Sequence, residues 1–579
     1  MNSHQSHLTK NVGVFLAQNK ERYEIISGFQ DLLNNINKES YAKTIKYIKL
    51  NNETFFNNRE SAILFLFNIN YFTIFNYKQM ELILDILCEF SAELKRIGID
   101  EIDIIDMNKH LLCDINYLFQ KKVISIQSII QKSVYLEQLF INFWPEIDEF
   151  DHEYAMLREE SLFTYNTDPD YVEDMKSLYK SIKANPKQHI LNRNKNYNPS
   201  ALHKAIRDDD LTLFKSILAK EKRDVNYKFD YSFYERTLTF DKKTSIIQVA
   251  AVYGSLKVFQ YLWNQKNIVL DKNLLCYAYS GRNREIIHTC EKKCSEDHIL
   301  YYAIYSHQKD LVDNLMKSST YQPKKKDIPN FVDDNENIYK KLTRENLMAV
   351  VRSGSAKIHL SCLNKILYIM EKVEDNTSKP SFSNCDTFLQ NCFYDLELFK
   401  FLYSNKSSKY DFFKGDPPKY LLAIDNAAFD VVKFLIKIEK PQNILTIFRD
   451  SLKLNSRIAN YILDLQIKEK SSKSKSSHSS LFDLFKSQLN MNDLALAIQY
   501  YNEDIIVKMN QLYGIIDKNQ KMFVSILTKF ASSSMINSLF NKNLAYTSNV
   551  NANFIAGILH QSGFEESAKH IYSIIPEYK

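Results

Sequence analysis

The chain is 579 residues long, with 45% hydrophobic residues, 13% aromatic residues and a formal net charge of +6. This length exceeds what one compact core serves, and the apolar content excludes a disordered chain, so we expect several domains or an elongated array. Ten glycines and 11 prolines are few for such a length, which argues against many tight β-turns and predicts an all-α fold. The small positive charge is spread along the chain and names no partner by itself.

The start of the chain predicts neither a signal peptide nor a membrane span. Met1–Lys10 is polar, and the most apolar early stretch, residues 62–75, is interrupted by Asn68 and Asn70. Eight cysteines, several of them at apolar positions of helical stripes, are typical of small buried side chains in a reducing compartment. We therefore expect a soluble intracellular protein in the cytoplasm, with no membrane insertion.

Residues 1–185 are expected to form an N-terminal helical domain. Apolar residues such as Ile83, Ile86 and Leu87 recur there at helical spacing. Trp144-Pro145 predicts the end of a helix, because the residue before a proline avoids the α region. The polar, asparagine-rich residues 185–198 then predict a connector.

A two-helix pattern recurs after residue 199, and an alanine marks its first helix. Leu202 stands three residues before Ala205 in the first copy, and Ile247 stands three before Ala250 in the second. Residues three apart share one face of a helix, and a small alanine there lets a neighbouring helix approach closely. The marker alanines are Ala205, Ala250, Ala278, Ala303, Ala423 and Ala497.

A second helix is predicted shortly after each alanine. Its apolar residues, for example Val258, Phe259 and Leu262, form a stripe that an isolated helix pair cannot hide from water, so neighbouring pairs must cover it. Side chains able to cap this helix open four copies: Asp210, Ser255, Asn283 and Asn502.

The sequence therefore predicts an N-terminal helical domain followed by an α-solenoid of helix-turn-helix repeats. The first block covers residues 199–316, and degenerate repeats cover 343–467. A Ser/Lys-rich segment at 468–480 is predicted as a low-complexity linker. Residues 481–579 are predicted to hold C-terminal repeats and a cap.

Residues 222–243 are too long for a short link between helices and alternate between apolar and polar residues, so we expect an exposed hairpin or finger. Four of its residues are of types enriched at interface anchors and form the candidate partner-binding set: Tyr231, Phe233, Tyr234 and Arg236. The alternative is that these rings fold back onto the adjacent helices, and the sequence favours neither arrangement.

The segment Ser200-Ala201-Leu202-His203-Lys204-Ala205 resembles the Thr-Pro-Leu-His-x-Ala opening of ankyrin repeats, and Asp224-Val225-Asn226 resembles their closing Asp-Val-Asn. Residues 250–262, with Gly254, and 277–283 are similar to a degenerate ankyrin-like domain of unknown function that is abundant in trichomonad protists. The resemblance implies protein–protein contacts, no catalysis, and a structural role for His203 between neighbouring loops. Unit lengths of 45, 28 and 25 residues depart from the usual 33, so the stack is expected to be irregular.

The strongest chemical candidate is the group His288, Cys290, Cys294 and His298, which carries the donor types of a zinc site. Its spacing is poor for zinc, and Cys290 takes the place of an apolar stripe residue. Neither the phosphate-binding pattern G-x-x-x-x-G-K-[ST] nor the hydrolase pattern G-x-S-x-G occurs. We therefore predict a non-catalytic scaffold that binds other proteins and needs no cofactor.

Two alternatives stay open. An enzyme site could lie in the unassigned N-terminal helices. A lysine-mediated nucleic-acid contact could use Lys324–Lys326 or the lysines of residues 468–475, although a solvated loop and linker explain these runs better, so nucleic acid is not the expected partner.

Overall fold

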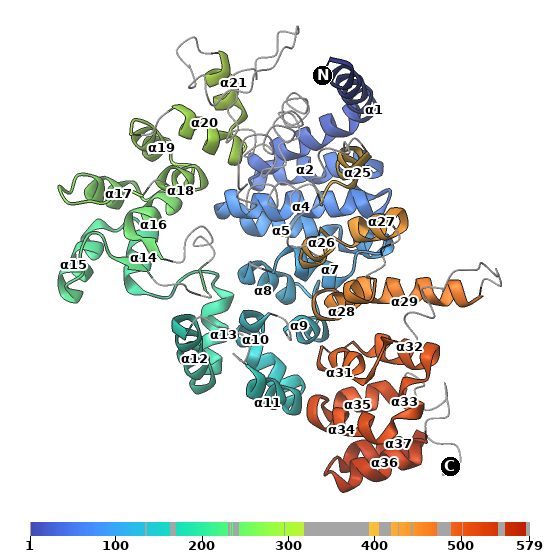
Figure 1. The fold of residues 1–579 in the computed structure, drawn as a ribbon. Helices are drawn as coiled ribbons and strands as arrows, with labels where there is room; N and C mark the ends of the chain where they lie inside the picture. Colours follow the sequence, from blue (N-terminus) through green and yellow to red (C-terminus); the bar gives the residue numbers. More distant parts are fainter. Residues whose placement is uncertain are drawn as a thin grey trace. The chain divides into compact units, whose positions relative to one another are not determined.

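The structure is a computed structural model of the chain (Figure 1). It describes residues 2–109, 111–133, 136–162, 169–229, 232, 234–235, 243–271, 273–293, 296–317, 393–404, 419–426, 428–439, 441, 444–471, 488–500, 502–541 and 551–574. Within these residues, regular structure is helical apart from one two-stranded hairpin. The predicted all-α fold class is confirmed.

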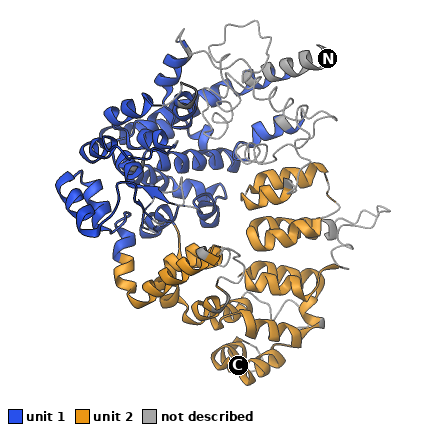
Figure 2. Ribbon diagram, turned by 60° about the vertical axis from the view of Figure 1, so that its left-hand side comes forward, with its two compact units in different colours: residues 1–123, 191–416 blue, residues 124–190, 417–579 orange. Residues whose placement is uncertain are grey.

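The chain divides into two compact units, and each joins segments that are far apart in the sequence (Figure 2). Unit 1 combines residues 1–123 with 191–416, and unit 2 combines residues 124–190 with 417–579. The linear domain boundaries of the sequence analysis stay predictions, and the units group the chain differently from them.

The N-terminal part of unit 1 consists of helices of very different lengths that pack as two rows. Its elements are α1 (Asn2–Asn34), α2 (Lys38–Leu50), α3 (Asn52–Phe56), α4 (Arg59–Phe75), η1 (Tyr77–Gln79), α5 (Met80–Glu89), α6 (Ser91–Arg96), α7 (Glu101–Met107) and α8 (Leu112–Gln120). Helix α4 packs between α1 and α7, and α5 packs between α2 and α8. Because α1 also packs on α2 and α4 on α5, this part too is built from helix pairs.

The second part of unit 1 holds four consecutive helix pairs. They are α14 (Ala201–Arg207) with α15 (Leu211–Glu221), α16 (Ile246–Tyr253) with α17 (Leu256–Trp263), α18 (Leu274–Gly281) with α19 (Arg284–Glu291), and α20 (Glu296–Tyr305) with α21 (Lys309–Lys317). The first helices pack in the order α14, α16, α18, α20, and the second helices in the order α15, α17, α19. Helix α25 (Leu396–Ser404) also belongs to this unit.

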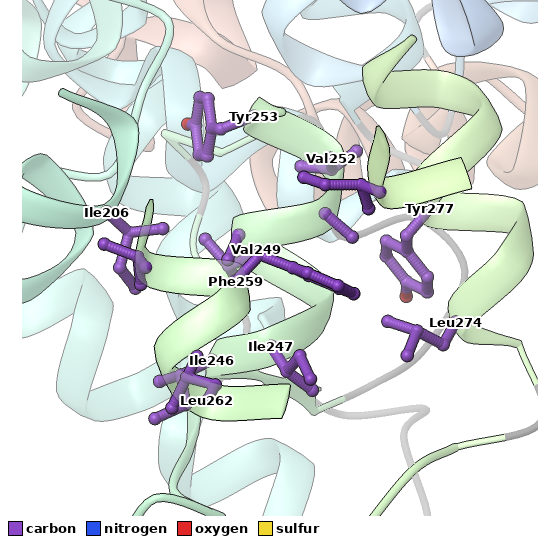
Figure 3. Packing of buried hydrophobic residues seen from close by; sticks show 14 of the residues in the cluster. Ile206, Ile246, Ile247, Val249, Val252, Tyr253, Phe259, Leu262, Leu274 and Tyr277 are labelled. Carbon is purple, nitrogen blue, oxygen red and sulfur yellow. The ribbon is translucent and has the colours of Figure 1, made fainter. Parts of the chain in front are cut away.

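One apolar cluster runs through these pairs (Figure 3). Phe259 and Leu262 of α17 belong to this cluster together with Ile246, Ile247 and Val249 of α16 and Tyr277 of α18 (Figure 3). Leu202 and all six marker alanines are buried, the alanines with no exposed surface. The stripes of α15 and α17 are thus covered by their own pair and by the next one.

The turn between the two helices of a pair contains a residue in the left-handed conformation in all four pairs of unit 1. The residue four places after the alanine has positive φ: 52° at Asp209, 65° at Gly254, 56° at Arg282 and 55° at His307. In three pairs the next residue donates its N–H to the carbonyl of the alanine, as Ser255 does to Ala250 over 2.9 Å. This is the Schellman ending of a helix, which satisfies carbonyls that the last turn leaves open.

Unit 2 repeats this two-row packing with five pairs. They are α26 (Lys419–Asp425) with α27 (Phe429–Glu439), α28 (Ile444–Leu454) with α29 (Ser456–Ser471), α31 (Met491–Gln499) with α32 (Glu503–Tyr513), α34 (Gln520–Phe530) with α35 (Ser533–Leu539), and α36 (Ala552–Gln561) with α37 (Glu565–Ile574). Successive first helices pack on each other, as do successive second helices down to α35 and α37. The short α33 (Ile515–Lys518) follows α32.

Residues 124–190 supply the other helices of unit 2. They are α9 (Ile126–Ser133), α10 (Glu137–Phe150), α11 (His152–Ser161), α12 (Pro169–Ala184) and the beginning of α13 (Pro186–Asn194). Two expectations were wrong here. Helix α10 continues through Pro145, and α13 occupies most of the predicted connector at 185–198.

No helix among the described residues is long and apolar enough to span a lipid bilayer. Of the predicted linker, residues 468–471 form the end of α29, and the rest lies outside the described residues.

Candidate interaction surface

The helix pairs of unit 1 present two opposite edges, which we name by their connections. The turn edge consists of the tight turns inside the pairs, at residues 208–210, 254–255, 282–283 and 306–308. The finger edge consists of the longer connections between pairs, at residues 222–245, 264–273 and 292–295. The two edges lie at opposite ends of the helix pairs. A segment that contacts one edge therefore does not cover the other.

The C-terminal end of α1 lies on the turn edge. Arg282 donates from its guanidinium to the backbone carbonyl and, over 2.6 Å, to the side-chain oxygen of Asn34. The Asn34 amide in turn donates to the carbonyl of His307 over 3.0 Å. Lys309 forms an ion pair with Asp31 at 2.8 Å. One turn of α1 therefore connects two consecutive turns of the helix-pair row.

Helix α4 covers the same edge with aromatic side chains. The Tyr71 hydroxyl donates to the carbonyl of Tyr305, and the Phe75 ring lies 5.0 Å from the Tyr305 ring in an edge-to-face arrangement. The His307 ring lies 4.7 Å from Phe72 and 5.2 Å from Tyr71. Tyr71, Phe72 and Phe75 are buried, so this contact is part of the core of unit 1.

Arg282 is largely buried, and the hydrogen-bond partners named above are the oxygens of Asn34 and not a carboxylate. This environment changes the pKa of its guanidinium. Desolvation lowers its pKa to about 10. The guanidinium remains charged at neutral pH, and the two Asn34 oxygens take the place of water around it. The turn edge at α18–α21 is thus already occupied by the chain itself.

The finger edge begins with the hairpin that the sequence predicts. Strand β1 (Lys228–Phe229) pairs antiparallel with β2 (Thr244–Ser245), with Lys228 opposite Ser245 and Phe229 opposite Thr244. Phe229 is buried, and its ring lies 4.3 Å from the ring of His203 on α14. The base of the finger therefore belongs to the apolar core.

A buried carboxylate ties the returning finger chain to the helices. Glu235 accepts a hydrogen bond from the Tyr253 hydroxyl at 2.6 Å and one from the backbone N–H of Asn198 at 3.2 Å. The Nδ1 atom of His203 lies 3.5 Å from the same carboxylate oxygen. Burial, with the nearby Arg207 charge, lowers the pKa of His203 to about 3, so the imidazole is neutral at pH 7.

The four predicted partner-binding residues of the finger divide into two groups. Tyr231, Phe233 and Arg236 lie outside the described residues. Tyr234 is half-buried, and its burial raises the pKa of its phenol. Because Phe229 and Glu235 of the same finger are buried, the described part of the finger is folded back against the helices.

The next finger, residues 264–273, presents apolar side chains that the sequence analysis did not single out. Val269 is 69% exposed and Leu270 is 38% exposed. The Asn226 side chain holds this finger by donating to the carbonyl of Asn267 and accepting from the N–H of Val269, over 2.9 and 2.8 Å. Three consecutive apolar residues, 268–270, between the polar Asn267 and Asp271 were the available sequence signal.

The candidate zinc group is not brought together in the described residues. Cys290 is buried in the apolar cluster, whereas the His288 side chain is 69% exposed. The positions of Cys294 and of the His298 side chain are not described. The described cysteines Cys88, Cys113, Cys276 and Cys290 carry free thiols, and the described residues hold no group of three or more acidic, histidine or cysteine side chains placed to bind a metal.

The lysine runs considered for a nucleic-acid contact lie mostly outside the described residues. Lys324–Lys326 and most lysines of residues 468–475 lie outside the described residues. Lys468 is exposed near the end of α29.

Residues 264–344 match a family described as a domain of unknown function, DUF3447. The match begins at the second finger and covers both pairs from α18 to α21. The predicted similarity to a domain of unknown function is thereby confirmed for this segment. Comparisons with curated proteins and with solved structures gave no match.

Proposed function

We propose that the chain is a non-catalytic scaffold of ankyrin-like helix pairs that binds other proteins along the finger edge of unit 1. The proposal depends on a difference between the two edges: one is covered by the chain itself, and the other keeps apolar side chains exposed. Tyr71, Phe72 and Asn34 occupy the turn edge from within the chain, whereas Val269 and Leu270 remain exposed on the finger edge.

The ankyrin-like assignment is supported by features of the repeats. Two rows of antiparallel helices, a left-handed residue at each turn and long connections on one side suit a solenoid in which each pair contacts its neighbours. Asn226, in the segment that resembles the closing ankyrin motif, bonds to the next finger through both polar atoms of its amide. Such bonds hold successive fingers in register, as a continuous binding surface requires.

Binding through the finger edge has a simple energetic basis. Burial of an exposed valine or leucine in a partner contributes about 1.5–3 kcal/mol, and residues at the centre of an interface contribute most. Lys266 and Asn267 beside Val269 are exposed and would form a polar rim. A solvated rim around an apolar centre is the usual composition of a transient protein interface.

The test is affinity capture of proteins from the native cell with the full chain. We expect Val269→Asp with Leu270→Ser to lose the captured proteins while circular dichroism and melting temperature stay unchanged. The matched control is Leu50→Asp, which changes another exposed leucine of unit 1, 74% exposed, far from the finger edge in sequence. A second variant shortens residues 222–243.

Two outcomes would contradict the proposal. Unchanged capture by both finger variants would place the interface elsewhere. Capture that disappears after nuclease treatment or in moderate salt would favour the nucleic-acid alternative, because phosphate contacts weaken steeply with salt.

A further inference from the structure

The finger edge of unit 1 carries an excess of basic residues. Its three connections, residues 222–245, 264–273 and 292–295, contain ten basic and five acidic residues, a net charge of +5. The turn edge at the other end of the same pairs contains three acidic residues and one basic residue, a net charge of −2. The two ends of the helix pairs therefore differ in the sign of their charge.

The lysines of the finger edge face solvent without an internal counter-charge. Five of them are exposed, and within the described part of the chain their ammonium groups form neither an ion pair nor a hydrogen bond: Lys222, Lys228, Lys266, Lys292 and Lys293. Lys222, Lys266 and Lys292 follow α15, α17 and α19, which pack in a row. Because neighbouring helix axes are about 8–10 Å apart, these lysines recur along the edge at about that spacing.

The described carboxylates of the edge are used by the unit itself. One oxygen of Asp224 accepts from the backbone N–H of Asn226 at 2.8 Å, and one oxygen of Asp271 accepts from that of Asn273 at 2.9 Å. Glu235 is buried and accepts a hydrogen bond from α16. Two carboxylates therefore fix turns and a third is buried, so the charge that the described edge presents to solvent is mainly positive.

The exposed aliphatic pair Val269 and Leu270 lies among these lysines. Lys266 stands three residues before Val269 in the same finger. The bonds of Asn226 to this finger bring the first finger beside it, and Lys228 follows Asn226 by two residues. A partner that covers the aliphatic pair must therefore also face ammonium groups.

We propose that the finger edge recognises an acidic protein segment that carries one large apolar anchor. This inference deepens the proposed function and rests on it. The anchor covers Val269 and Leu270, and carboxylates on either side of it face Lys228, Lys266 and Lys293. In an extended segment, which rises about 3.3 Å per residue, every third residue matches a spacing of about 10 Å. Complementary charge of this kind accelerates association and rejects basic segments.

Nucleic acid fits the described part of the edge less well. Single strands bind through exposed aromatic rings on which bases stack, in addition to basic residues. The Tyr227 ring packs edge-to-face against buried Phe229 and is covered by the Arg223 guanidinium at 4.1 Å. The large apolar side chains exposed on the described edge are the aliphatic Val269 and Leu270, for which phosphates offer no partner.

The test uses a display library of random short peptides as the probe and the full chain as the target. We expect the selected peptides to carry several carboxylates around one large apolar residue. Fluorescence anisotropy then measures the dissociation constant of one selected peptide. Lys228→Gln, Lys266→Gln and Lys293→Gln together should weaken binding on the order of tenfold, because exposed ion pairs contribute little singly but three are lost.

The matched control neutralises three exposed lysines of α2 in the same unit, by Lys38→Gln, Lys43→Gln and Lys46→Gln. It makes the same change in net charge and should leave the dissociation constant unchanged. Circular dichroism checks the folding of both variants. Should the finger variant fail to fold, Lys266→Gln alone should still weaken binding, on the order of twofold.

Three results would overturn the inference. They are a selection without an acidic bias, equal affinities of the finger variant and the α2 control, and tighter binding of single-stranded RNA or of phosphatidylserine vesicles than of the selected peptide. Failure of the proposed function gives a different result, namely protein capture that Val269→Asp with Leu270→Ser leaves unchanged. Capture that this variant abolishes but the lysine variant retains would refute the acidic partner alone.

Discussion

The left-handed residue at each turn of unit 1 shows how different side chains meet one backbone requirement. Asp209, Gly254, Arg282 and His307 share a φ between 52° and 65°, although only glycine adopts it without a steric cost. Each of the others gains contacts that offset the cost. Asp209 accepts from the N–H groups of Lys257 and Val258, and Arg282 bonds to Asn34.

The marker alanine is small because two helices meet at its position. Ala250 lies on α16, which packs against α14, α17 and α18, and it has no exposed surface. The close fit extends to α18, where a Cβ atom at Gly281 would lie 2.0 Å from the carbonyl oxygen of Ala251. Space for a larger side chain is therefore lacking on this side of the row.

We expect Ala250→Leu to overpack the helix seam and to lower the free energy of unfolding by about 1–3 kcal/mol. The matched control is Ala219→Leu on α15, because Ala219 is exposed on the same set of pairs. Thermal or urea denaturation followed by circular dichroism measures both. Equal stability of the two variants would show that Ala250 does not occupy a tight seam.

The neutral state of His203 makes folding depend on pH. Its pKa is lowered by burial to about 3, below the ordinary value of 6.5 in the unfolded chain. Between these values the unfolded chain binds a proton that the folded chain does not, so stability is complete above pH 6.5 and falls as the pH decreases.

From pH 7 to pH 5, His203 should therefore remove about 2 kcal/mol from the free energy of unfolding. His203→Leu should lose about that much less over the same interval, since leucine does not titrate. Denaturant titrations of both proteins at pH 7 and pH 5 provide the comparison. Parallel pH dependence in the two proteins would mean that His203 accepts a proton in the folded state.

At the scale of elements, the residues that open the second helices have two different roles. Asp210 and Asn283 cap their own helices as predicted. Ser255 makes no capping bond and instead donates to the carbonyl of Ile206 in the preceding pair, over 2.6 Å. Asn502 also makes no capping bond, and its side-chain amide donates to the carbonyl of Leu452 in the preceding pair at 2.9 Å, so the capping prediction was wrong for Ser255 and Asn502. Cap positions therefore also connect neighbouring pairs, which the sequence pattern alone does not indicate.

One arginine contact occurs in both units with the same sequence spacing. Arg59 binds both oxygens of Asp103, which also belongs to the capping box of α7, and donates to the carbonyl of Gly98. Arg449 also binds both oxygens of an aspartate, Asp493 of α31, through Nε and Nη2, and its Nη2 donates to the carbonyl of Gln488. Each arginine lies 44 residues before its aspartate.

We expect Arg59→Ala to destabilise unit 1 by about 3 kcal/mol, because the buried Asp103 carboxylate would lose its partner. Lys20→Ala is the control; it removes an exposed ion pair with Glu24 at 3.9 Å and should cost less than about 1 kcal/mol. Thermal denaturation of both variants measures the difference. A loss for Arg59→Ala as small as that for the control would show that solvent reaches Asp103.

Two local rules gave wrong predictions where tertiary contacts outweigh them. Pro145 removes one hydrogen bond from α10, at a cost of about 3 kcal/mol, but Phe140, Ile141 and Ile147 of this helix are buried and favour its continuation. The polar residues of α13 form a helix because His189 is buried and bonds to the carbonyl of Asn142 at 2.8 Å. Neither the burial of these α10 side chains nor the bond of His189 can be predicted from the neighbouring residues in sequence.

At the scale of the molecule, sequence order and spatial grouping differ. Residues 124–190 lie in one unit with residues 417–579, and residues 1–123 lie in the other with the first repeats. Hydrophobic periodicity predicts which face of a helix is buried. It does not predict which other helix covers that face, so the grouping cannot be inferred from sequence order. The two-row packing of the N-terminal helices escaped the sequence analysis for a related reason, since that part lacks the marker alanine.

The candidate surface was predictable only in part. Composition and turn spacing located the finger, and the residue types at Tyr231, Phe233, Tyr234 and Arg236 suggested binding. The exposure of Val269 and Leu270 depends instead on how Asn226 holds the second finger, a contact between residues 41 and 43 positions apart. Occupation of the turn edge by Tyr71 involves a partner 234 residues away.

Local sequence was sufficient to predict the all-α fold class, the helix pairs after residue 199 and the positions of their small buried residues. These follow from helical spacing, from capping side chains and from the few glycines and prolines, all of which act over a few residues. The covered edge of the pairs, the exposed side chains and the segments that share a unit became known from the folded structure. Those outcomes depend on surfaces brought together by chain folding, and no local pattern encodes the partner of a surface.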